Sequence, residues 1–203
     1  MSPEPLLLAA ALVTGYLFGS LSAAILISRL MGLPDPRTVG SGNPGTTNVL
    51  RSGGKLAAAL TLLGDMLKGV IPVLAVYALE GEASLAALAG LGAFLGHLYP
   101  VFFQFRGGKG VATALGALLA VSWITGLLAL ATWLAVSLTF RISSLAALTT
   151  FTLTPLYLWV TTGNTVVVGI FAVVAALIFW RHRSNIRNLL SGTEPKIGKS
   201  KTG

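Results

Sequence analysis

The chain has 203 residues, of which 54% are hydrophobic and 10% are charged, and its formal net charge is +8. Soluble domains carry about 25% charged residues, so this composition excludes an ordinary soluble domain and predicts a polytopic membrane protein. The absence of cysteine excludes disulfides and thiolate catalysis. The two histidines are too few and too scattered to predict a zinc site, so we expect no bound metal.

Seven apolar segments, taken in chain order, approach or exceed the length needed to cross a bilayer as a helix. They are residues 6–30, 55–79, 83–103, 109–122, 124–140, 143–161 and 163–181, of which the fourth and fifth are short. The first has no evident small-residue cleavage site, so we expect a retained helix and not a signal peptide. The predicted fold is an all-α polytopic membrane protein with seven transmembrane helices. It forms one domain, 1–203, with a basic cytoplasmic tail from about residue 182.

The basic residues predict the orientation of these helices. The opposite connections carry Glu4, Glu80 and Glu82 and nothing basic, and Lys68 lies within the second span. The positive-inside rule then places the amino terminus outside and the carboxyl terminus in the cytoplasm. Nucleic-acid binding is not expected, because no aromatic platform accompanies the basic tail. The predicted cytoplasmic face collects the other 13 of the 14 basic residues: Arg29, Arg37, Arg51, Lys55, Arg106, Lys109, Arg141, Arg181, Arg183, Arg187, Lys196, Lys199 and Lys201.

A polar, glycine-rich loop joins the first two spans and has the composition of an anion-binding site. Asn43 followed by Pro44 is typical of an N-cap and a first helical position. The next backbone N–H groups would be unpaired and, with the positive end of the helix dipole, would attract phosphate. Arg51 follows Thr47 by four residues and shares its face. A plain glycine-rich turn is the alternative. The candidate residues are Ser41, Gly42, Asn43, Gly45, Thr46, Thr47, Asn48 and Arg51.

Ionisable residues also lie inside the second and third spans. Asp65 and Lys68 are at i and i+3 on one helix face, and buried charges in a bilayer are commonly paired and functional. We count both among the candidate substrate-binding residues, while favouring a supporting role over direct chemistry. His97 is a further candidate, and a core histidine bonded to a backbone carbonyl is the alternative.

The loop before the fourth span combines glycines with a lysine. Gly107, Gly108 and Gly110 surround Lys109, so the backbone can form a concave nest beside a point charge for phosphate. The pattern is not that of the G-x-x-x-x-G-K-[ST] phosphate loop. Simple positive-inside anchoring is the alternative, and the glycines on both sides favour a binding role.

Two more polar groups lie at predicted cytoplasmic ends of spans. Ser143 and Ser144 begin the sixth span, where one serine can cap the helix and leave the other for a ligand. His182 and Asn185 lie at i and i+3, which a basic stop-transfer flank does not explain. Together the cytoplasmic groups predict one or two phosphorylated small molecules as ligands.

Standard nucleophile sets are missing from the sequence. It contains no G-x-S-x-G, no His-x-x-x-x-Asp, no cysteine and no aspartate-rich metal cluster. Chemistry at this face would therefore need an already activated donor, with the protein supplying position and electrostatics.

These motifs resemble those of the bacterial membrane acyl-phosphate:glycerol-3-phosphate acyltransferases. The resemblance rests on the segments 40–51, 64–69, 96–110 and 181–194, and runs from the first span to the tail. It implies a seven-span enzyme of the bacterial cytoplasmic (inner) membrane whose active site faces the cytoplasm and which uses no cofactor.

The resemblance also implies a reaction and roles. A fatty acyl group would pass from acyl phosphate to the 1-hydroxyl of glycerol 3-phosphate, giving lysophosphatidic acid and phosphate in phospholipid synthesis. The implied partners are these two substrates, membrane lipid and, transiently, the soluble enzyme that makes acyl phosphate. Five candidate catalytic residues follow: Ser41, Arg51 and Lys109 would hold phosphate groups, and His182 and Asn185 would orient glycerol 3-phosphate. The proton acceptor is either His182 or a phosphate oxygen of a substrate.

A transporter or channel for a phosphorylated small anion is the alternative function. Polar groups at broken helices fit that class, but it predicts binding groups near the membrane midplane and a water path outward. Here the donors lie at one face. A purely structural membrane protein would explain the spans and leave the polar clusters without a purpose.

Overall fold

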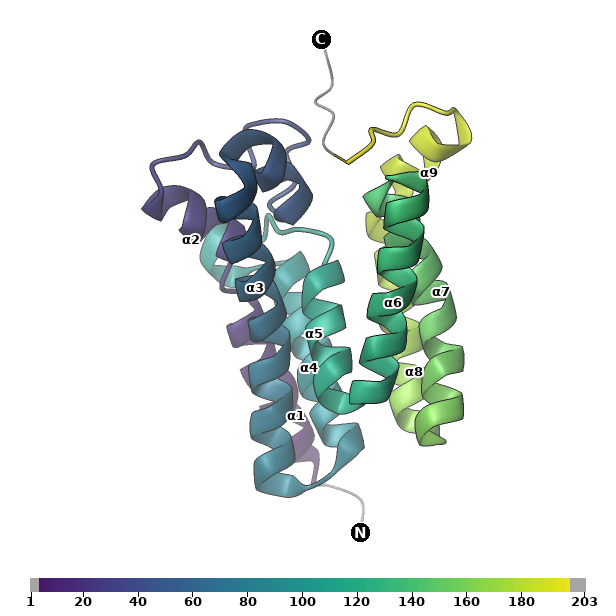
Figure 1. Cartoon of the computed structure of the whole chain (residues 1–203). Coiled ribbons are helices and arrows are strands. Elements are labelled where there is room, and N and C mark those ends of the chain that lie inside the picture. The colour runs from purple at the N-terminus through teal and green to yellow at the C-terminus, as the bar shows by residue number, and fades with distance from the viewer. Residues whose placement is uncertain (1–3, 198–203) are drawn as a thin grey trace.

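The computed structural model describes residues 4–197, which form helices and connecting loops without strands (Figure 1). The predicted all-helical fold is confirmed. Two residues of the predicted basic tail, Lys199 and Lys201, lie outside the described residues. The elements are α1 (Pro5–Gly19), α2 (Ala23–Leu30), α3 (Thr46–Glu80), α4 (Ala83–Leu98), the 3-10 helix η1 (Val101–Phe103), α5 (Val111–Val121), α6 (Trp123–Phe140), α7 (Ser143–Thr162), α8 (Thr165–Arg181) and α9 (Arg183–Leu190).

Five of the described segments are long and apolar enough to cross a membrane, which agrees with a multi-pass protein. Helices α8 and α9 form a sixth candidate when taken together, with a bend of 61° between them. The predicted fourth span forms α5, whose 11 residues rise only about 16 Å, against a hydrocarbon core of about 30 Å. The five segments are Pro5–Leu30, Thr46–Glu80, Ala83–Phe103, Trp123–Phe140 and Ser143–Thr162.

The first predicted span, 6–30, agrees with the candidate span Pro5–Leu30, but two helices form it where one was predicted. Helix α1 ends at Gly19 and α2 begins at Ala23. The break releases the carbonyl of Leu21 from helical bonding, and Lys68 Nζ donates a hydrogen bond to it at 2.9 Å. Because a buried carbonyl needs a donor, this contact from another helix stabilises the break.

Small residues let α1 and α4 approach closely. A Cβ atom at Gly15 would collide with the backbone carbonyl of Ala89, and one at Gly92 would collide with that of Leu12. Such contacts between backbones are typical of helices packed inside a membrane, where van der Waals contact drives association.

Helix α3 begins two residues later than predicted, so the predicted cap is wrong. Its N-cap is Gly45, whose own N–H donates to the carbonyl of Asn43 at 2.9 Å, and its first helical residue is Thr46. Gly54 then interrupts the helix with φ of 83° and ψ of −177°, a conformation that glycine alone adopts without strain. The helix resumes at Lys55, where the second span is predicted to start.

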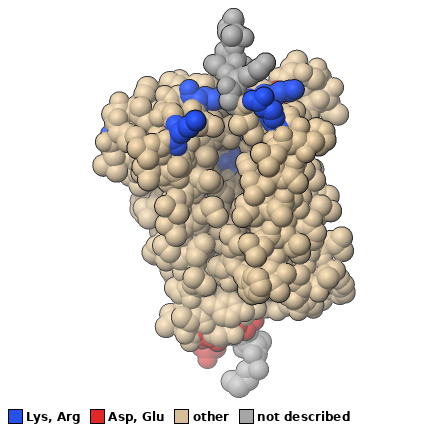
Figure 2. Space-filling model, viewed as in Figure 1, with Lys and Arg blue, Asp and Glu red and all other residues tan. Residues whose placement is uncertain are grey.

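The two ends of the molecule differ in charge. Helices α2 and α9 lie at the same end of the bundle (Figure 1). Figure 2 shows Lys and Arg gathered at this end and a group of acidic residues at the opposite end. The polar loops therefore meet at the basic end of the molecule, above a core in which Phe94, Phe151 and Phe171 are almost wholly buried.

Candidate active site

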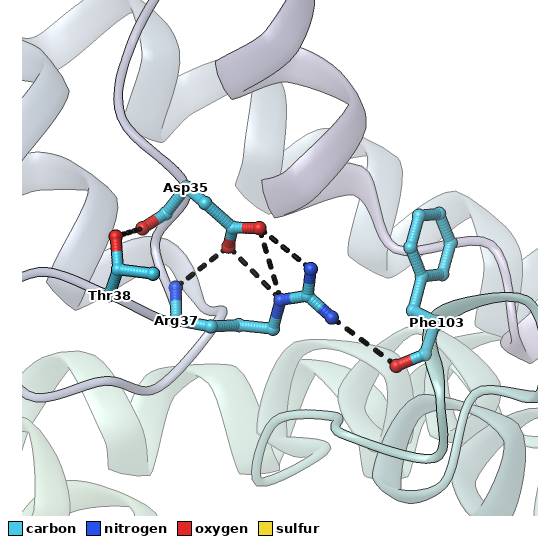
Figure 3. Close-up of polar contacts among 4 residues, drawn as sticks. All are labelled: Asp35, Arg37, Thr38 and Phe103. Atoms are coloured by element: carbon cyan, nitrogen blue, oxygen red, sulfur yellow. Dashed lines mark hydrogen bonds and ion pairs between the residues drawn. The ribbon is translucent and has the colours of Figure 1, made fainter.

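An ion pair shapes the start of the loop between α2 and α3 (Figure 3). Arg37 NH2 lies 2.7 Å from Asp35 Oδ2, and the Arg37 backbone N–H donates to Asp35 Oδ1 at 2.9 Å. Hydrogen bonds from Arg37 hold the pKa of Asp35 below its usual value. Arg37 NH1 also donates to the carbonyl of Phe103 at 3.3 Å, and Thr38 Oγ1 donates to the carbonyl of Asp35 at 2.9 Å. The loop is thereby tied to η1, which is distant in sequence.

Asn48 shapes the rest of this loop. Its Oδ1 accepts the N–H of Ser41 at 2.9 Å, and its Nδ2 donates to the carbonyls of Pro36 and Val39 at 2.8 and 3.0 Å. The side chain is buried, so its amide is committed to the loop backbone. Asn48 thus positions Ser41, whose side chain is exposed at the basic end.

The second glycine loop, 107–110, packs where side chains do not fit. The N–H of Gly108 donates to the carbonyl of His97 at 3.1 Å. A Cβ at Gly107 would collide with that same carbonyl, and one at Gly108 would collide with the His97 ring and crowd the carbonyl of Pro44. Gly110 has φ of 80° and is the N-cap of α5. The two glycine loops therefore touch each other, which the sequence alone does not indicate.

The buried ionisable residues form one network beneath this loop. Lys68 Nζ lies 2.9 Å from Asp65 Oδ1, and His97 Nδ1 lies 3.6 Å from the same oxygen. His97 Nδ1 also lies 3.2 Å from Thr113 Oγ1, so its partner is a hydroxyl and not a backbone carbonyl. All four residues are at most 6% exposed. This placement agrees with a supporting role for Asp65, Lys68 and His97, because the network touches the glycine loop through the His97 ring and the His97 carbonyl.

The two serines at the start of α7 bond to other segments. The N-cap is Ile142 and no side chain caps the helix, so the predicted serine cap is wrong. Ser143 Oγ lies 3.3 Å from Thr47 Oγ1 of α3, and Ser144 Oγ donates to Glu194 Oε1 at 2.7 Å. Ser143 is the less buried of the two serines.

Glu194 joins the tail to this site. It ends the last of the four segments that carry the family resemblance, but the sequence analysis assigned it no role. Its Oε1 accepts from Asn185 Nδ2 at 2.6 Å as well as from Ser144, and its Oε2 accepts from Asn188 Nδ2 at 3.2 Å. The one available signal was an isolated acid in a basic tail. The carboxylate holds the amide of Asn185 in one orientation, with its oxygen directed at Lys109.

Lys109 and Arg51 are the two cations of the site. Lys109 Nζ donates to Asn185 Oδ1. Burial, helped by the charges of Arg181 and Arg51 and opposed by that of Glu194, lowers the pKa of Lys109 to about 8. Arg51 NH2 lies 3.5 Å from the carbonyl of Lys196, while its buried Nε has no hydrogen-bond partner within residues 4–197. A guanidinium with spare donors beside a half-buried ammonium group is suited to binding a phosphate.

His182 is a neutral group at the junction of α8 and α9. Its Nδ1 lies 2.8 Å from the carbonyl of Ile178, which can only accept, so Nδ1 carries the proton and Nε2 is the free acceptor. Burial, followed by the charge of Lys109, lowers the pKa of His182 to about 4. The imidazole is therefore uncharged at neutral pH.

The structure brings together a subset of the predicted residues. Thr47, Arg51, Lys109, Ser143 and Asn185 lie where α3, α7, α9 and the second glycine loop meet, linked by the contacts above. Asp65, Lys68 and His97 make no hydrogen bond or ion pair with these five residues in the described part of the chain. In the described part of the chain, no group of three His, Asp or Glu side chains could hold a metal ion.

The fold and the site define an integral membrane protein with a cluster of cationic and polar side chains at its basic end. A family model described as glycerol-3-phosphate acyltransferase matches residues 9–192. The glycerol-3-phosphate acyltransferase of Thioalkalivibrio sulfidiphilus is 61% identical over 194 residues, covering 95% of this chain and 96% of that protein. That of Methylococcus capsulatus is 54% identical over 183 residues, covering 90% and 92%.

Two solved structures are also similar. The glycerol 3-phosphate form of PlsY (YgiH), an integral membrane glycerol 3-phosphate acyltransferase, matches with a TM-score of 0.89 at 42% identity, covering 94% of this chain and 96% of that one. Its lysophosphatidic acid form matches with a TM-score of 0.85 at 39% identity, covering 94% and 95%. The chain belongs to the glycerol-3-phosphate acyltransferase family. The resemblance found in the sequence is confirmed, and the transporter alternative is set aside.

Proposed function

We propose that this chain transfers a fatty acyl group from acyl phosphate to the 1-hydroxyl of glycerol 3-phosphate, giving lysophosphatidic acid and phosphate in phospholipid synthesis. Family membership supports the reaction, as do similar structures described as glycerol 3-phosphate and lysophosphatidic acid forms. The observation that carries the proposal is that Lys109, bonded to Asn185, lies close enough to Arg51 for the two charges to interact, while Arg51 Nε has no partner among residues 4–197. Two cations with spare donors therefore lie at one end of a membrane helix bundle.

The substrates carry two phosphate groups, which need cations and backbone donors. Arg51, Lys109 and Ser41 bind them, together with the N–H groups that begin α3, which have no intrahelical acceptor. Asn185 and His182 orient glycerol 3-phosphate. Ser143 is the serine nearer the substrate, because Ser144 is occupied by Glu194.

The acyl transfer is direct. The glycerol hydroxyl oxygen attacks the acyl carbonyl carbon, the bond from that carbon to the phosphate oxygen breaks, and phosphate leaves with the electron pair. The anionic intermediate is stabilised by Arg51, Lys109 and loop N–H groups. Phosphate is a good leaving group, so no acyl-enzyme is needed, and the chain has no cysteine to form a thioester.

The hydroxyl proton passes to a phosphate oxygen. His182 has a pKa of about 4, whereas the second pKa of a phosphate monoester is about 6, so a phosphate oxygen is the stronger base of the two. The unprotonated Nε2 of His182 accepts a hydrogen bond from the other free hydroxyl of glycerol 3-phosphate. This contact orients the substrate, while the proton of the attacking 1-hydroxyl goes to the phosphate oxygen.

The topology follows from the charge distribution. We place seven crossings in the bacterial cytoplasmic membrane, with the amino terminus outside and the site facing the cytoplasm. The separation of basic and acidic ends supports this orientation. The short helix α5 crosses where the protein locally thins the bilayer or covers the helix ends. A soluble enzyme on the cytoplasmic side delivers acyl phosphate.

The test uses purified protein in lipid vesicles with labelled glycerol 3-phosphate and either acyl phosphate or an acyl thioester. We expect labelled lysophosphatidic acid with acyl phosphate alone, and no covalent acyl adduct in intact-protein mass spectrometry. Efficient turnover of the thioester, or a stable acyl adduct, would contradict direct transfer.

A further inference from the structure

Arg181, the last residue of α8, bonds to the second glycine loop in a way that the reaction scheme above does not use. Its Nε donates to the carbonyl of Gly108 at 3.1 Å, and its NH2 donates to the carbonyls of Gly107 and Gly108 at 3.0 and 2.9 Å. Sequence reasoning attributed this arginine to the basic flank of the last span. In the structure its planar fork spans two successive peptide groups in a fixed geometry that the single, freely rotating ammonium group of a lysine does not reproduce.

These bonds determine where the backbone N–H groups of the loop point. The peptide bonds of the described chain are all trans, so the N–H of each peptide points away from its carbonyl. The Gly107 carbonyl faces Arg181, and the N–H of Gly108 on the opposite edge donates to His97. The Gly108 carbonyl also faces Arg181, and the N–H on the opposite edge belongs to Lys109. That N–H has no acceptor among residues 4–197.

Arg181 is itself held in place. Its guanidinium carbon lies 5.7 Å from the centre of the Tyr99 ring, a cation–π distance. The carbonyl of Tyr99 accepts the hydroxyl of Tyr16 at 2.7 Å, which ties this segment to α1. Arg181 is therefore fixed before any substrate arrives, and three of its donor contacts are already made to the protein.

We infer that Arg181 is a positioning residue that fixes the Gly108–Lys109 peptide so that the Lys109 N–H is directed at a substrate phosphate. The inference rests on the proposed function, because it assumes that Lys109 lies at the phosphate site. Arg181 touches the loop and not the reacting atoms. The phosphate is held by both the ammonium group and the backbone N–H of Lys109, and Arg181 controls the second of these.

The test compares Arg181→Lys with Arg183→Gln as a matched control. Arg183 lies two residues away and also stacks on an aromatic ring, Trp180 at 5.1 Å, but its one backbone contact is to the carbonyl of that same residue. The measurements are KM for each substrate, kcat, inhibition by inorganic phosphate, and the thermal unfolding midpoint. Loss of one hydrogen bond to a charged group corresponds to a roughly tenfold loss of affinity.

We expect Arg181→Lys to raise the inhibition constant of inorganic phosphate about tenfold, with a similar rise in KM for one substrate. The substrate whose KM rises is the one whose phosphate the N–H holds. The unfolding midpoint should stay within a few degrees of wild type, and Arg183→Gln should behave as wild type.

Two outcomes overturn the inference. An unchanged phosphate inhibition constant in Arg181→Lys would show that the N–H does not hold phosphate. A large fall in the unfolding midpoint in Arg181→Lys would show that Arg181 is structural. The variant Arg51→Ala distinguishes an error about the role of Arg181 from an error in the assignment of the phosphate site. Loss of activity in Arg51→Ala beside a normal Arg181→Lys would reject the inference alone, while normal activity in both would reject the site assignment.

Discussion

Replacing Lys109 by arginine separates the charge of this residue from its titration. Burial lowers the pKa of Lys109 to about 8, from an ordinary value of 10.5. This shift corresponds to a cost on the order of 3 kcal/mol for keeping the buried side chain charged. A bound phosphate dianion reverses that cost, so substrate affinity depends on whether Lys109 is protonated when the substrate arrives.

The pH dependence of kcat/KM should report this proton, because kcat/KM reflects the free enzyme. Lys109 is about nine-tenths charged at pH 7 and about one-tenth charged at pH 9. We therefore expect kcat/KM to be level below about pH 8 and to fall about tenfold per unit above it. In Lys109→Arg the guanidinium stays charged, so the alkaline fall should vanish even though the absolute rate is lower. His182 is neutral throughout this range.

Folding stability should change with pH in the opposite direction to kcat/KM. The folded pKa of Lys109 lies below the unfolded value, so between about pH 8 and 10.5 the unfolded chain holds a proton that the folded chain has lost. The contribution of Lys109 to stability therefore rises with pH in this window. If activity falls with rising pH while the unfolding midpoint does not, the loss of activity comes from titration of Lys109 and not from denaturation.

The assay measures labelled lysophosphatidic acid from about pH 6 to about pH 10, with unfolding midpoints at the same pH values and intact acyl phosphate quantified in parallel. An alkaline fall of the same position and slope in wild type and Lys109→Arg would refute the reasoning. So would a wild-type profile that stays level to the highest pH.

Three further predictions concern other parts of the chain. Arg51→Ala should lower kcat/KM at least tenfold while the protein stays folded, because a charge-assisted contact contributes about 1.5–3 kcal/mol; Arg51→Lys should recover only part of the loss in the same assay. Asp65→Asn should lower the free energy of unfolding by about 3–5 kcal/mol, since it leaves the buried Lys68 ammonium uncompensated. Replacing both residues by apolar ones should lower this free energy by less, as measured by denaturant unfolding of both variants. A single cysteine that replaces Glu82 should react with an impermeant thiol reagent added outside intact cells. A single cysteine that replaces Lys196 should react only after the membrane is opened, and the opposite result would reverse the topology.

Local sequence properties determine much of this protein. The limits of the predicted spans from 55 onward agree within five residues with α4 to α8 and with the part of α3 that follows the break at Gly54, because each is a mainly apolar run bounded by glycines, charges or polar caps. The polar clusters also lie at one end, because charged residues are expensive inside a bilayer and are placed at its face. The glycine loops and their cations could be found for the same reason.

Tertiary contacts decided the rest. The break at Leu21 depends on a donor from Lys68, which lies 47 residues away, so no window of local sequence reveals it. The role of Glu194 arises only when the tail folds back onto α7 and α9. Arg181 looks like one more flanking cation until the loop packs beneath it. In each case a hydrogen bond between distant segments replaces a local one, because buried polar groups must be paired wherever a partner can be found.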